Sequence, residues 1–229
     1  MVFVAIPVKS LKDAKRRLEG LLSNEERRQL CLAMLNDVLK AVGISKYVER
    51  IVIISCDRFV LRLAEKMGAI GFDEGESRGL NSAIASVSKF CLGKGAESTL
   101  VLPIDIPLVK STDIDYIIGK SRSTRSVVIS PSTDERGTNA LLMRPPLVIK
   151  PRFGLNSFKA HIGEAITDNI RYRIFRSPRV ALDIDTPRDL ALFSKLGGST
   201  ETYSYMTKID LINRTDEYLK GIHNPLLRK

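Results

Sequence analysis

Short apolar runs alternate with helical segments through the first 130 residues of the chain. Strands that are apolar on both faces are typical of a parallel sheet covered by helices on each side. The sequence therefore predicts a three-layer α/β fold with a mostly parallel sheet. The expected strands are residues 2–6, 50–55, 69–72, 99–102 and 126–130, and the expected helices are 23–43, 57–68, 78–91 and one from 111.

The second part of the chain is less regular. Turn-forming residues fill much of 131–158, and we expect a strand at 139–143, a helix at 157–167, an arginine-rich strand at 171–176 and a helix at 187–196. Two glycines at 197–198 then mark a boundary. We therefore expect a domain over 1–198 and an extension over 199–229 that packs on the body or on a second copy of the chain.

Composition favours a protein of the cytoplasm. No apolar run approaches the roughly 18–20 residues that span a bilayer, and the N-terminal run lacks the flanking features of a signal peptide. The three cysteines, Cys31, Cys56 and Cys91, are widely spaced. They are expected to be reduced and buried as small apolar side chains, without a disulfide or zinc site.

The formal net charge of +10 is the unusual bulk property. Basic residues are scattered among acids, with no basic tail and no stripe of interleaved aromatic residues. Such a surface could attract a nucleic acid or steer a small phosphorylated substrate. The charge indicates anionic ligands in general and leaves both alternatives open.

Two acidic signatures, at 102–108 and 180–187, each follow an apolar run that we expect to be a buried strand ending before a proline. Ligands of open α/β sheets bind at the carboxyl ends of strands. Asp105, Asp183 and Asp185 could therefore hold Mg²⁺ together, since oxygen ligands suit that ion. Alternatively, Asp105 caps the helix after residue 110, and Asp183 and Asp185 cap the helix that begins at Pro187.

Two further segments could bind a nucleotide. The loop after the first strand contains Pro7, Lys9 and Lys15 and has neither a Walker nor a dinucleotide-binding glycine pattern. Its lysines could reach triphosphate oxygens, or the loop could simply be solvated. In the second segment, Gly79 would let the backbone approach a ligand and Asn81 could bond a nucleobase edge. The alternative there is a simple turn and a helix cap.

The histidines do not indicate a hydrolase. The chain has His161 and His223 and lacks the G-x-S-x-G pattern of a serine hydrolase. We expect His161 to lie on a helix surface or to contact a substrate phosphate, and not to act as a general base.

Taken in order, seven segments resemble the archaeal 2-phospho-L-lactate guanylyltransferase (CofC) family, whose bacterial relatives use phosphoenolpyruvate. The resemblance covers residues 1 to about 196. Its segments are 6–9, 14–18, 78–81, 102–108, 137–141, 153–158 and 183–187.

The resemblance implies a nucleotide-diphospho-sugar (glycosyltransferase-A-like) nucleotidyltransferase fold. It also implies a reaction of GTP with 2-phospholactate that yields lactyl-diphospho-guanosine and pyrophosphate during coenzyme F-420 biosynthesis. By motif position, the three aspartates correspond to the region of metal and acceptor. Thr138, Gly154 and Ser157 correspond to the acceptor-binding set. A phosphate monoester is already a nucleophile, so Asp105, Lys9 and Lys15 would act by positioning and charge stabilisation.

Three alternatives stay open at this point. The acceptor could be phosphoenolpyruvate or another phosphorylated molecule, the nucleotide could be CTP, or the protein could be a non-catalytic nucleotide- or nucleic-acid-binding protein. Enzyme activity without nucleic acid or membrane is the main expectation. A homodimer with the C-terminal segment as an exchanged arm is also expected.

Overall fold

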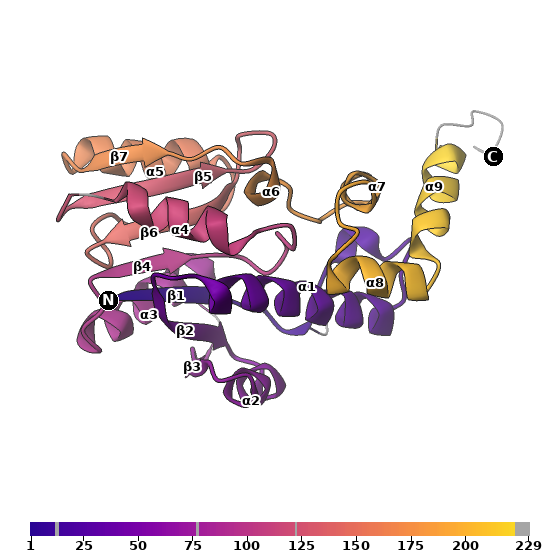
Figure 1. Ribbon diagram of the computed structural model, residues 1–229, viewed down its shortest axis with the longest axis horizontal. Coiled ribbons are helices and arrows are strands. Elements are labelled where there is room, and N and C mark those ends of the chain that lie inside the picture. The colour runs from indigo at the N-terminus through magenta and orange to yellow at the C-terminus, as the bar shows by residue number, and fades with distance from the viewer. Residues whose placement is uncertain (12–13, 77, 122, 223–229) are drawn as a thin grey trace.

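The computed structural model describes residues 1–11, 14–76, 78–121 and 123–222. A seven-stranded sheet in the order β3-β2-β1-β4-β6-β5-β7 forms its centre (Figure 1). The strands are β1 (Val2–Pro7), β2 (Val48–Ser55), β3 (Ile70–Asp73), β4 (Ser98–Val101), β5 (Ser126–Pro131), β6 (Thr138–Arg144) and β7 (Arg171–Ile174).

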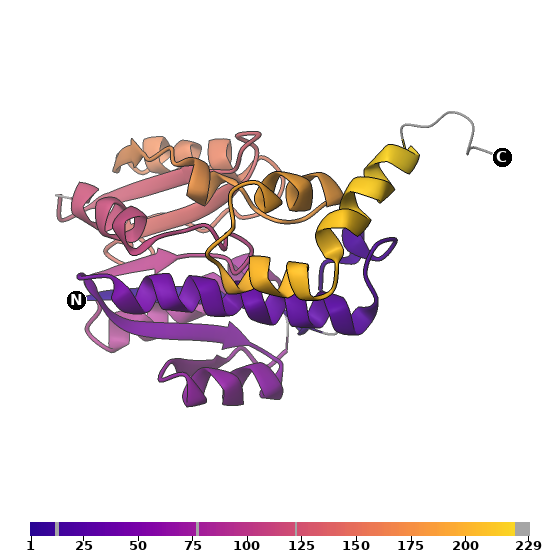
Figure 2. The ribbon, with the colours of Figure 1, turned by 45° about the vertical axis from the view of Figure 1, so that its right-hand side comes forward.

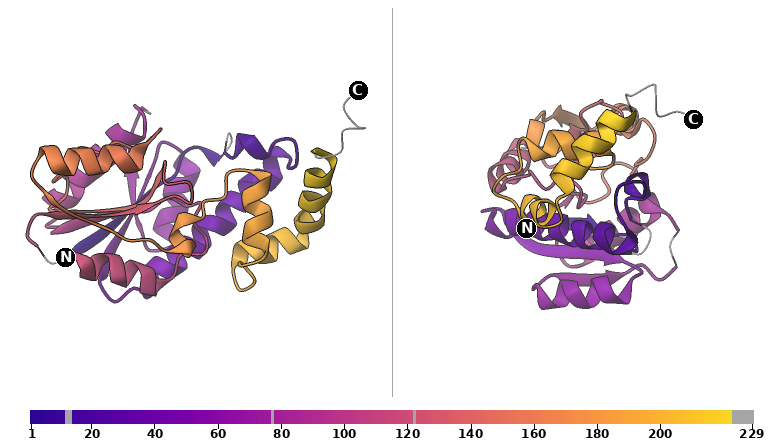
Figure 3. Two further views of the ribbon diagram at one scale, coloured as in Figure 1. Left: turned by 90° about the horizontal axis from the view of Figure 1, so that it is seen from above. Right: turned by 90° about the vertical axis from the view of Figure 1, so that its right-hand side faces the viewer.

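Helices cover both faces of the sheet, as the top view in Figure 3 shows. They are α1 (Asn24–Ile44), α2 (Arg58–Lys66), α3 (Leu80–Gly93), α4 (Ser111–Lys120), α5 (Ser157–Thr167), α6 (Pro178–Ala181), α7 (Pro187–Ser194), α8 (Glu201–Lys208) and α9 (Leu211–Ile222), with a 3₁₀ turn η2 (Arg16–Leu18). A hydrophobic core lies on each face of the sheet, and alternate residues of β1 pack into one core or the other. Val4 and Ile6 pack with α1 and α4, whereas Phe3 and Ala5 pack with α3 and α5. The predicted three-layer, mostly parallel α/β fold is therefore confirmed.

The sheet contains one antiparallel strand. β6 pairs antiparallel with both β4 and β5, while β1 pairs parallel with β2 and β4. Only residues 132–137 separate β5 from β6, and a connection this short joins antiparallel neighbours, whereas a parallel pair needs a longer crossover. β5 and β7 consequently run parallel to β1, and β7 lies at the sheet edge with every side chain exposed.

One predicted strand is wrong. Residues 178–181 form the short helix α6, not the buried strand expected before Asp183. Pro178 occupies the first turn of this helix, where the fixed proline φ favours helix initiation. The apolar pattern was too short to separate a strand from a buried helical turn.

The cysteine expectation is correct in part. Cys31 and Cys91 are buried, but Cys56 is exposed because it follows the end of β2, directly before the residue that caps α2. All three thiols are free. Across the described ranges, no helix is long and apolar enough to cross a bilayer.

The C-terminal helices pack on the body of their own chain. α8 lies along α1, as the turned view in Figure 2 shows, and α9 packs on α7. Met206 and Leu211 are buried in the core beside α1. Asp37 of α1 accepts hydrogen bonds from the backbone N–H groups of Glu201 (2.8 Å) and Thr202 (2.9 Å) at the start of α8. The division at residue 198 itself stays a prediction.

Replacing Asp37 should loosen α8. Asp37→Ala removes an acceptor for two backbone N–H groups and the Thr202 hydroxyl, so the free energy of unfolding should fall by about 1–3 kcal/mol. Urea unfolding measures the loss, and amide exchange across 201–208 should accelerate. Lys40→Ala, on an exposed part of α1, is the control; equal effects of both variants would contradict this role.

Candidate active site

The two acidic segments lie side by side. Asp105 follows β4, and Asp183 and Asp185 lie between α6 and α7. The backbone N–H of Ile184 donates to the backbone oxygen of Asp105 at 2.9 Å. This bond places the acidic residues of both segments next to one another, near the carboxyl ends of β1 and β4.

None of the three aspartates is a helix cap. α7 is capped by Thr186, whose side chain pairs reciprocally with Asp189. α4 begins after Lys110, with Asp113 accepting from the Lys110 backbone N–H at 3.1 Å. The capping alternative is therefore wrong for all three residues, and their carboxylates are available for other partners.

Lys15 joins two of these carboxylates. Its ammonium donates to Asp105 Oδ2 at 2.8 Å and to Asp185 Oδ1 at 2.7 Å, and its side chain is 8% exposed. Burial alone would lower the pKa of Lys15, but the two carboxylates outweigh it and hold that pKa above its ordinary value. The backbone of Lys15 is left-handed (φ 53°, ψ 45°), an uncommon state for a residue with a side chain. Arg17 adds a weaker contact to Asp185 at 3.8 Å.

Asp183 lies in a different environment. Burial raises the pKa of its carboxyl group to about 6, and the charge of Asp105 adds to the shift. Asn139 Nδ2 donates to Asp183 Oδ1 at 3.1 Å and also bonds the backbone oxygens of Val180 and Ala181. Asn139 is a site residue that the sequence reasoning missed, although it follows Thr138 within a segment that had been singled out.

A cavity of about 1110 Å³ adjoins the acidic cluster. Asp183 and Asp185 line it, together with Lys9, Arg17, Gly137 and Gly154. Lys9 also lines a small pocket with Pro7 and Gly79, so three residues predicted to bind the nucleotide meet at one place. Gly79 has φ +90°, and a side chain there would be strained.

The Asn81 side chain bonds a loop of its own chain, and its contact with a nucleobase stays a prediction. Its side-chain amide donates to the backbone oxygen of Phe153 at 3.0 Å and accepts from the Phe153 N–H at 2.6 Å. Both polar groups of Asn81 therefore hold the loop that precedes Gly154. That glycine has φ +123°, a conformation that side chains disfavour.

Thr138, one of the predicted acceptor residues, contacts His161. Thr138 Oγ1 lies 3.0 Å from His161 Nδ1, and the Arg152 N–H donates to His161 Nε2 at 2.9 Å. Ser157 begins α5, and its N–H donates to the Gly154 oxygen at 3.2 Å. His161 is fully buried, so its expected place on a helix surface is wrong. The helical spacing of Phe158, His161 and Ala165 places all three on one face of α5, and this spacing is the signal that could have indicated the burial.

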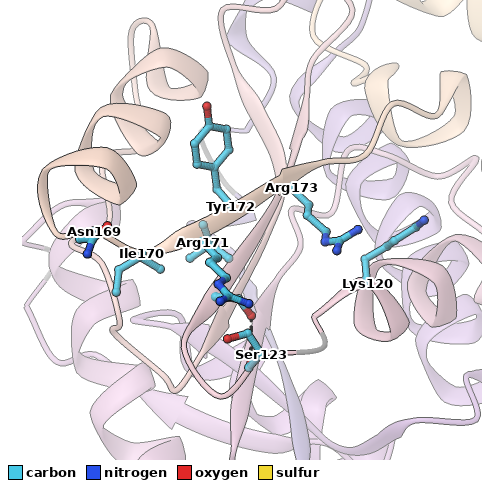
Figure 4. Close-up of a pocket in the computed structure, with 9 residues that line it drawn as sticks. Lys120, Ser123, Asn169, Ile170, Arg171, Tyr172 and Arg173 are labelled. Atoms are coloured by element: carbon cyan, nitrogen blue, oxygen red, sulfur yellow. Dashed lines mark hydrogen bonds between the residues drawn. The ribbon is translucent and has the colours of Figure 1, made fainter.

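A second cavity lies at the other end of the sheet. Lys120, Arg171 and Arg173 extend around it near the amino ends of β5 and β7 (Figure 4). Because β5 and β7 run parallel to β1 and β4, this basic surface is remote from the aspartates. It is not part of the candidate active site.

The fold matches that of known sugar-nucleotide and nucleotidyl transferases. A solved structure from Desulfovibrio desulfuricans, described as a nucleotide-diphospho-sugar transferase, superposes with a TM-score of 0.76, covering 93% of this chain and 97% of its own at 14% identity. A cytidylyltransferase from Leptospira borgpetersenii gives a TM-score of 0.60 at 17% identity, covering 94% and 95% of the two chains. The chain thus has the nucleotide-diphospho-sugar transferase fold, with acidic and basic groups at its ligand-binding edge.

Residues 2–220 match the family model described as guanylyl transferase CofC like, and the chain belongs to this family of nucleotidyltransferases. The match extends beyond residue 196 and includes α8 and most of α9. A phosphoenolpyruvate guanylyltransferase from Rubrobacter xylanophilus is 38% identical over 86% of this chain and 95% of its own. A 2-phospho-L-lactate guanylyltransferase from Methanobrevibacter smithii is 34% identical over 92% and 91%.

Buried His161 should make stability depend on pH. Burial lowers the pKa of its imidazole from 6.5 to about 4, with Glu164 opposing and Arg152 reinforcing the shift. Between pH 6.5 and about 4, His161 is therefore protonated in the unfolded chain but neutral in the folded protein. Stability from this group is complete above pH 6.5 and falls by up to about 3 kcal/mol as pH decreases toward 4.

Urea unfolding of the wild type and His161→Gln at a series of pH values measures this effect. The stability advantage of the wild type should shrink steadily below pH 6.5. A constant difference between the two proteins from pH 7.5 to 4.5 would show that His161 is not held neutral.

Proposed function

We propose that the chain condenses GTP with (2S)-2-phospholactate to give lactyl-2-diphospho-5'-guanosine and pyrophosphate, a step of coenzyme F-420 biosynthesis. Family membership supports guanylyl transfer. The observation that supports the acceptor is a single cavity lined both by Asp183 and Asp185 and by the loops that contain Gly137 and Gly154. Such a cavity can hold a compact phospho-acid beside charged groups that act on a triphosphate.

The reaction needs no dedicated base. An acceptor phosphate oxygen forms a bond to the α-phosphorus of GTP while the bond from that phosphorus to the pyrophosphate oxygen breaks. The nucleophile is already an anion at neutral pH. The protein therefore contributes positioning and charge stabilisation, with Lys9 and Arg17 on the cavity wall suited to phosphate oxygens.

Mg²⁺ is part of the proposal, and the residues fit it in part. Asp105, Asp183 and Asp185 would hold the ion and supply the oxygen ligands that it prefers. Magnesium would neutralise phosphate charge as the pyrophosphate leaves. Within the described residues, however, no three acidic, histidine or cysteine side chains are already grouped to hold an ion. The Lys15 ammonium lies between Asp105 and Asp185, so lysine and metal should compete for these carboxylates.

Lys15→Met tests this competition without turnover. The variant leaves two carboxylates without their ammonium, so the free energy of unfolding should fall by about 1–3 kcal/mol in metal-free buffer. Added Mg²⁺ should then stabilise the variant more than the wild type, because its competitor is gone. Thermal unfolding with and without Mg²⁺ measures both effects.

Lys9→Met is the matched control, because Lys9 is exposed and makes no ion pair with a carboxylate among the residues that the structure describes. Equal stabilisation of wild type and Lys15→Met by Mg²⁺ would place the metal away from these carboxylates.

Product analysis tests the reaction itself. Wild-type protein is incubated with GTP, Mg²⁺ and equal amounts of 2-phospholactate and phosphoenolpyruvate, and products are identified by mass spectrometry. We expect the lactyl product and pyrophosphate, and Asp105→Ala should lose most turnover while remaining folded. A predominant phosphoenolpyruvate product would establish the alternative acceptor, and products with CTP in place of GTP would change the nucleotide. Near-normal turnover by Asp105→Ala in the presence of Mg²⁺ would show that Asp105 is not a metal ligand.

The remaining parts of the proposal concern the cellular setting. We propose a cytoplasmic enzyme that acts on GTP and a small phospho-acid, with no nucleic acid or membrane partner. We further propose a homodimer. α8 is bound to Asp37 of its own chain, so an exchanged arm would have to replace that contact with the same contact from a second copy.

A further inference from the structure

A small recess lies where three of the predicted nucleotide-binding residues meet. Pro7, Lys9 and Gly79 line it, at the carboxyl ends of the neighbouring strands β1, β2 and β3 (Figure 1). Its volume is about 20 Å³, which is room for one edge of a base and not for a whole nucleotide. Lys9 also lines the large cavity beside the acidic cluster. A nucleotide that spans both would place its base at the recess and its phosphates toward the aspartates.

The recess contains a carboxylate that the sequence reasoning did not single out. Glu74 follows β3 directly and lines the recess together with Pro7 and Gly79. Its backbone N–H donates to the backbone oxygen of Ser55, the last residue of β2, at 3.2 Å. This bond holds the backbone of Glu74 beside the strand ends where the base would lie.

The Glu74 side chain is half-buried, and within the described ranges it makes no hydrogen bond or ion pair. Burial raises the pKa of its carboxyl group, the charge of Asp73 adds to the shift, and the charge of Lys9 opposes it. An ionised carboxylate has acceptors and no donor, so its partial burial without a donor is unfavourable. A ligand that brings donors to the recess would relieve this.

Guanine is the base whose edge fits such an acceptor. Its N1–H and its 2-amino group are neighbouring donors that point the same way, toward the two oxygens of one carboxylate. Adenine and cytosine place an unprotonated ring nitrogen there, and uracil has a single N–H between two carbonyl oxygens. Each of these bases would bring an acceptor against the Glu74 carboxylate and leave polar groups unpaired.

We propose that Glu74 is a specificity-determining residue that selects guanine by accepting hydrogen bonds from N1–H and from the 2-amino group. The inference rests on the proposed use of GTP and adds the residue that distinguishes the base. A carboxylate at this place could instead accept from ribose hydroxyls. That contact would be the same for every nucleotide, so the two roles differ in what they predict for different bases.

Glu74→Gln separates the two roles. The amide keeps one oxygen and replaces the other with an NH₂ group, which opposes the 2-amino group of guanine but matches the C2 carbonyl oxygen of xanthine. Isothermal titration calorimetry with Mg²⁺ and without acceptor measures the affinities for GTP and for xanthosine triphosphate (XTP). The Kd of GTP should rise by about 10- to 100-fold, and the Kd of XTP should fall by a similar factor.

Inosine triphosphate (ITP) removes the 2-amino group from the ligand. Wild type should bind ITP about 10-fold more weakly than GTP, whereas Glu74→Gln should show no preference for GTP. This comparison in the wild type needs no variant, so it decides the 2-amino contact even if Glu74→Gln does not fold. Glu76→Gln is the matched control, because it changes an exposed carboxylate of the same loop that does not line the recess. Its nucleotide affinities should equal those of the wild type.

An equal loss of affinity for GTP, XTP and ATP in Glu74→Gln would place the carboxylate on the ribose or the phosphates and overturn the proposal. An unchanged affinity for GTP in this variant, or equal binding of GTP and ITP by the wild type, would overturn it as well. The proposed reaction fails separately. A wild type that binds GTP selectively but forms no product with either phospho-acid would overturn the reaction and leave the guanine contact in place.

Discussion

The ammonium of Lys15 is the interaction on which the candidate site depends. It joins the loop after β1 to the segment after β4 and to the segment before α7. These three segments are far apart in sequence, and all carry charge. A buried ion pair of this kind adds little net stability, because desolvation offsets most of the attraction, but removing one partner is costly. Lys15 therefore specifies an arrangement more than it strengthens the fold.

That arrangement places several carboxylates and basic side chains close to one another. Burial raises the pKa of Asp183, and the negative charges of Asp105 and Asp185 raise it further. A single ammonium compensates only part of this charge. Arg17 supplies a weaker contact. The cavity is therefore lined by carboxylates, which attract cations, and by the exposed basic side chains of Lys9 and Arg17. A lining that carries both charges suits a metal-bound triphosphate and its pyrophosphate product.

Local rules explain which features the sequence revealed. Ser23 and Glu26 form the predicted capping box, and the helix at Ser157–Thr167 has the predicted bounds, because both depend on neighbours within a few residues. The direction of β6 depends on the length of the connection between β5 and β6. The helical conformation of residues 178–181 depends on a proline at the start of a very short apolar run. The hydrogen-bond partners of Lys15 and Asn81 lie 72 or more residues away in the sequence. Those of His161 lie 9 and 23 residues away. Residue type indicated that such side chains could bind something, but only the fold determined what they bind.

The C-terminal helices belong to this same structure. Asp189 of α7 accepts from the N–H of Asp185 at 3.1 Å and of Thr186 at 2.7 Å, which fixes the backbone at the end of the acidic segment. α9 packs on α7, and Arg214 of α9 pairs with Glu26 at the start of α1 at 2.6 Å. Glu26 is also part of the capping box of α1. The same side chain therefore caps α1 and forms an ion pair with α9. Contacts therefore connect Asp185, through α7, to residues beyond 198, and the family match likewise extends to residue 220.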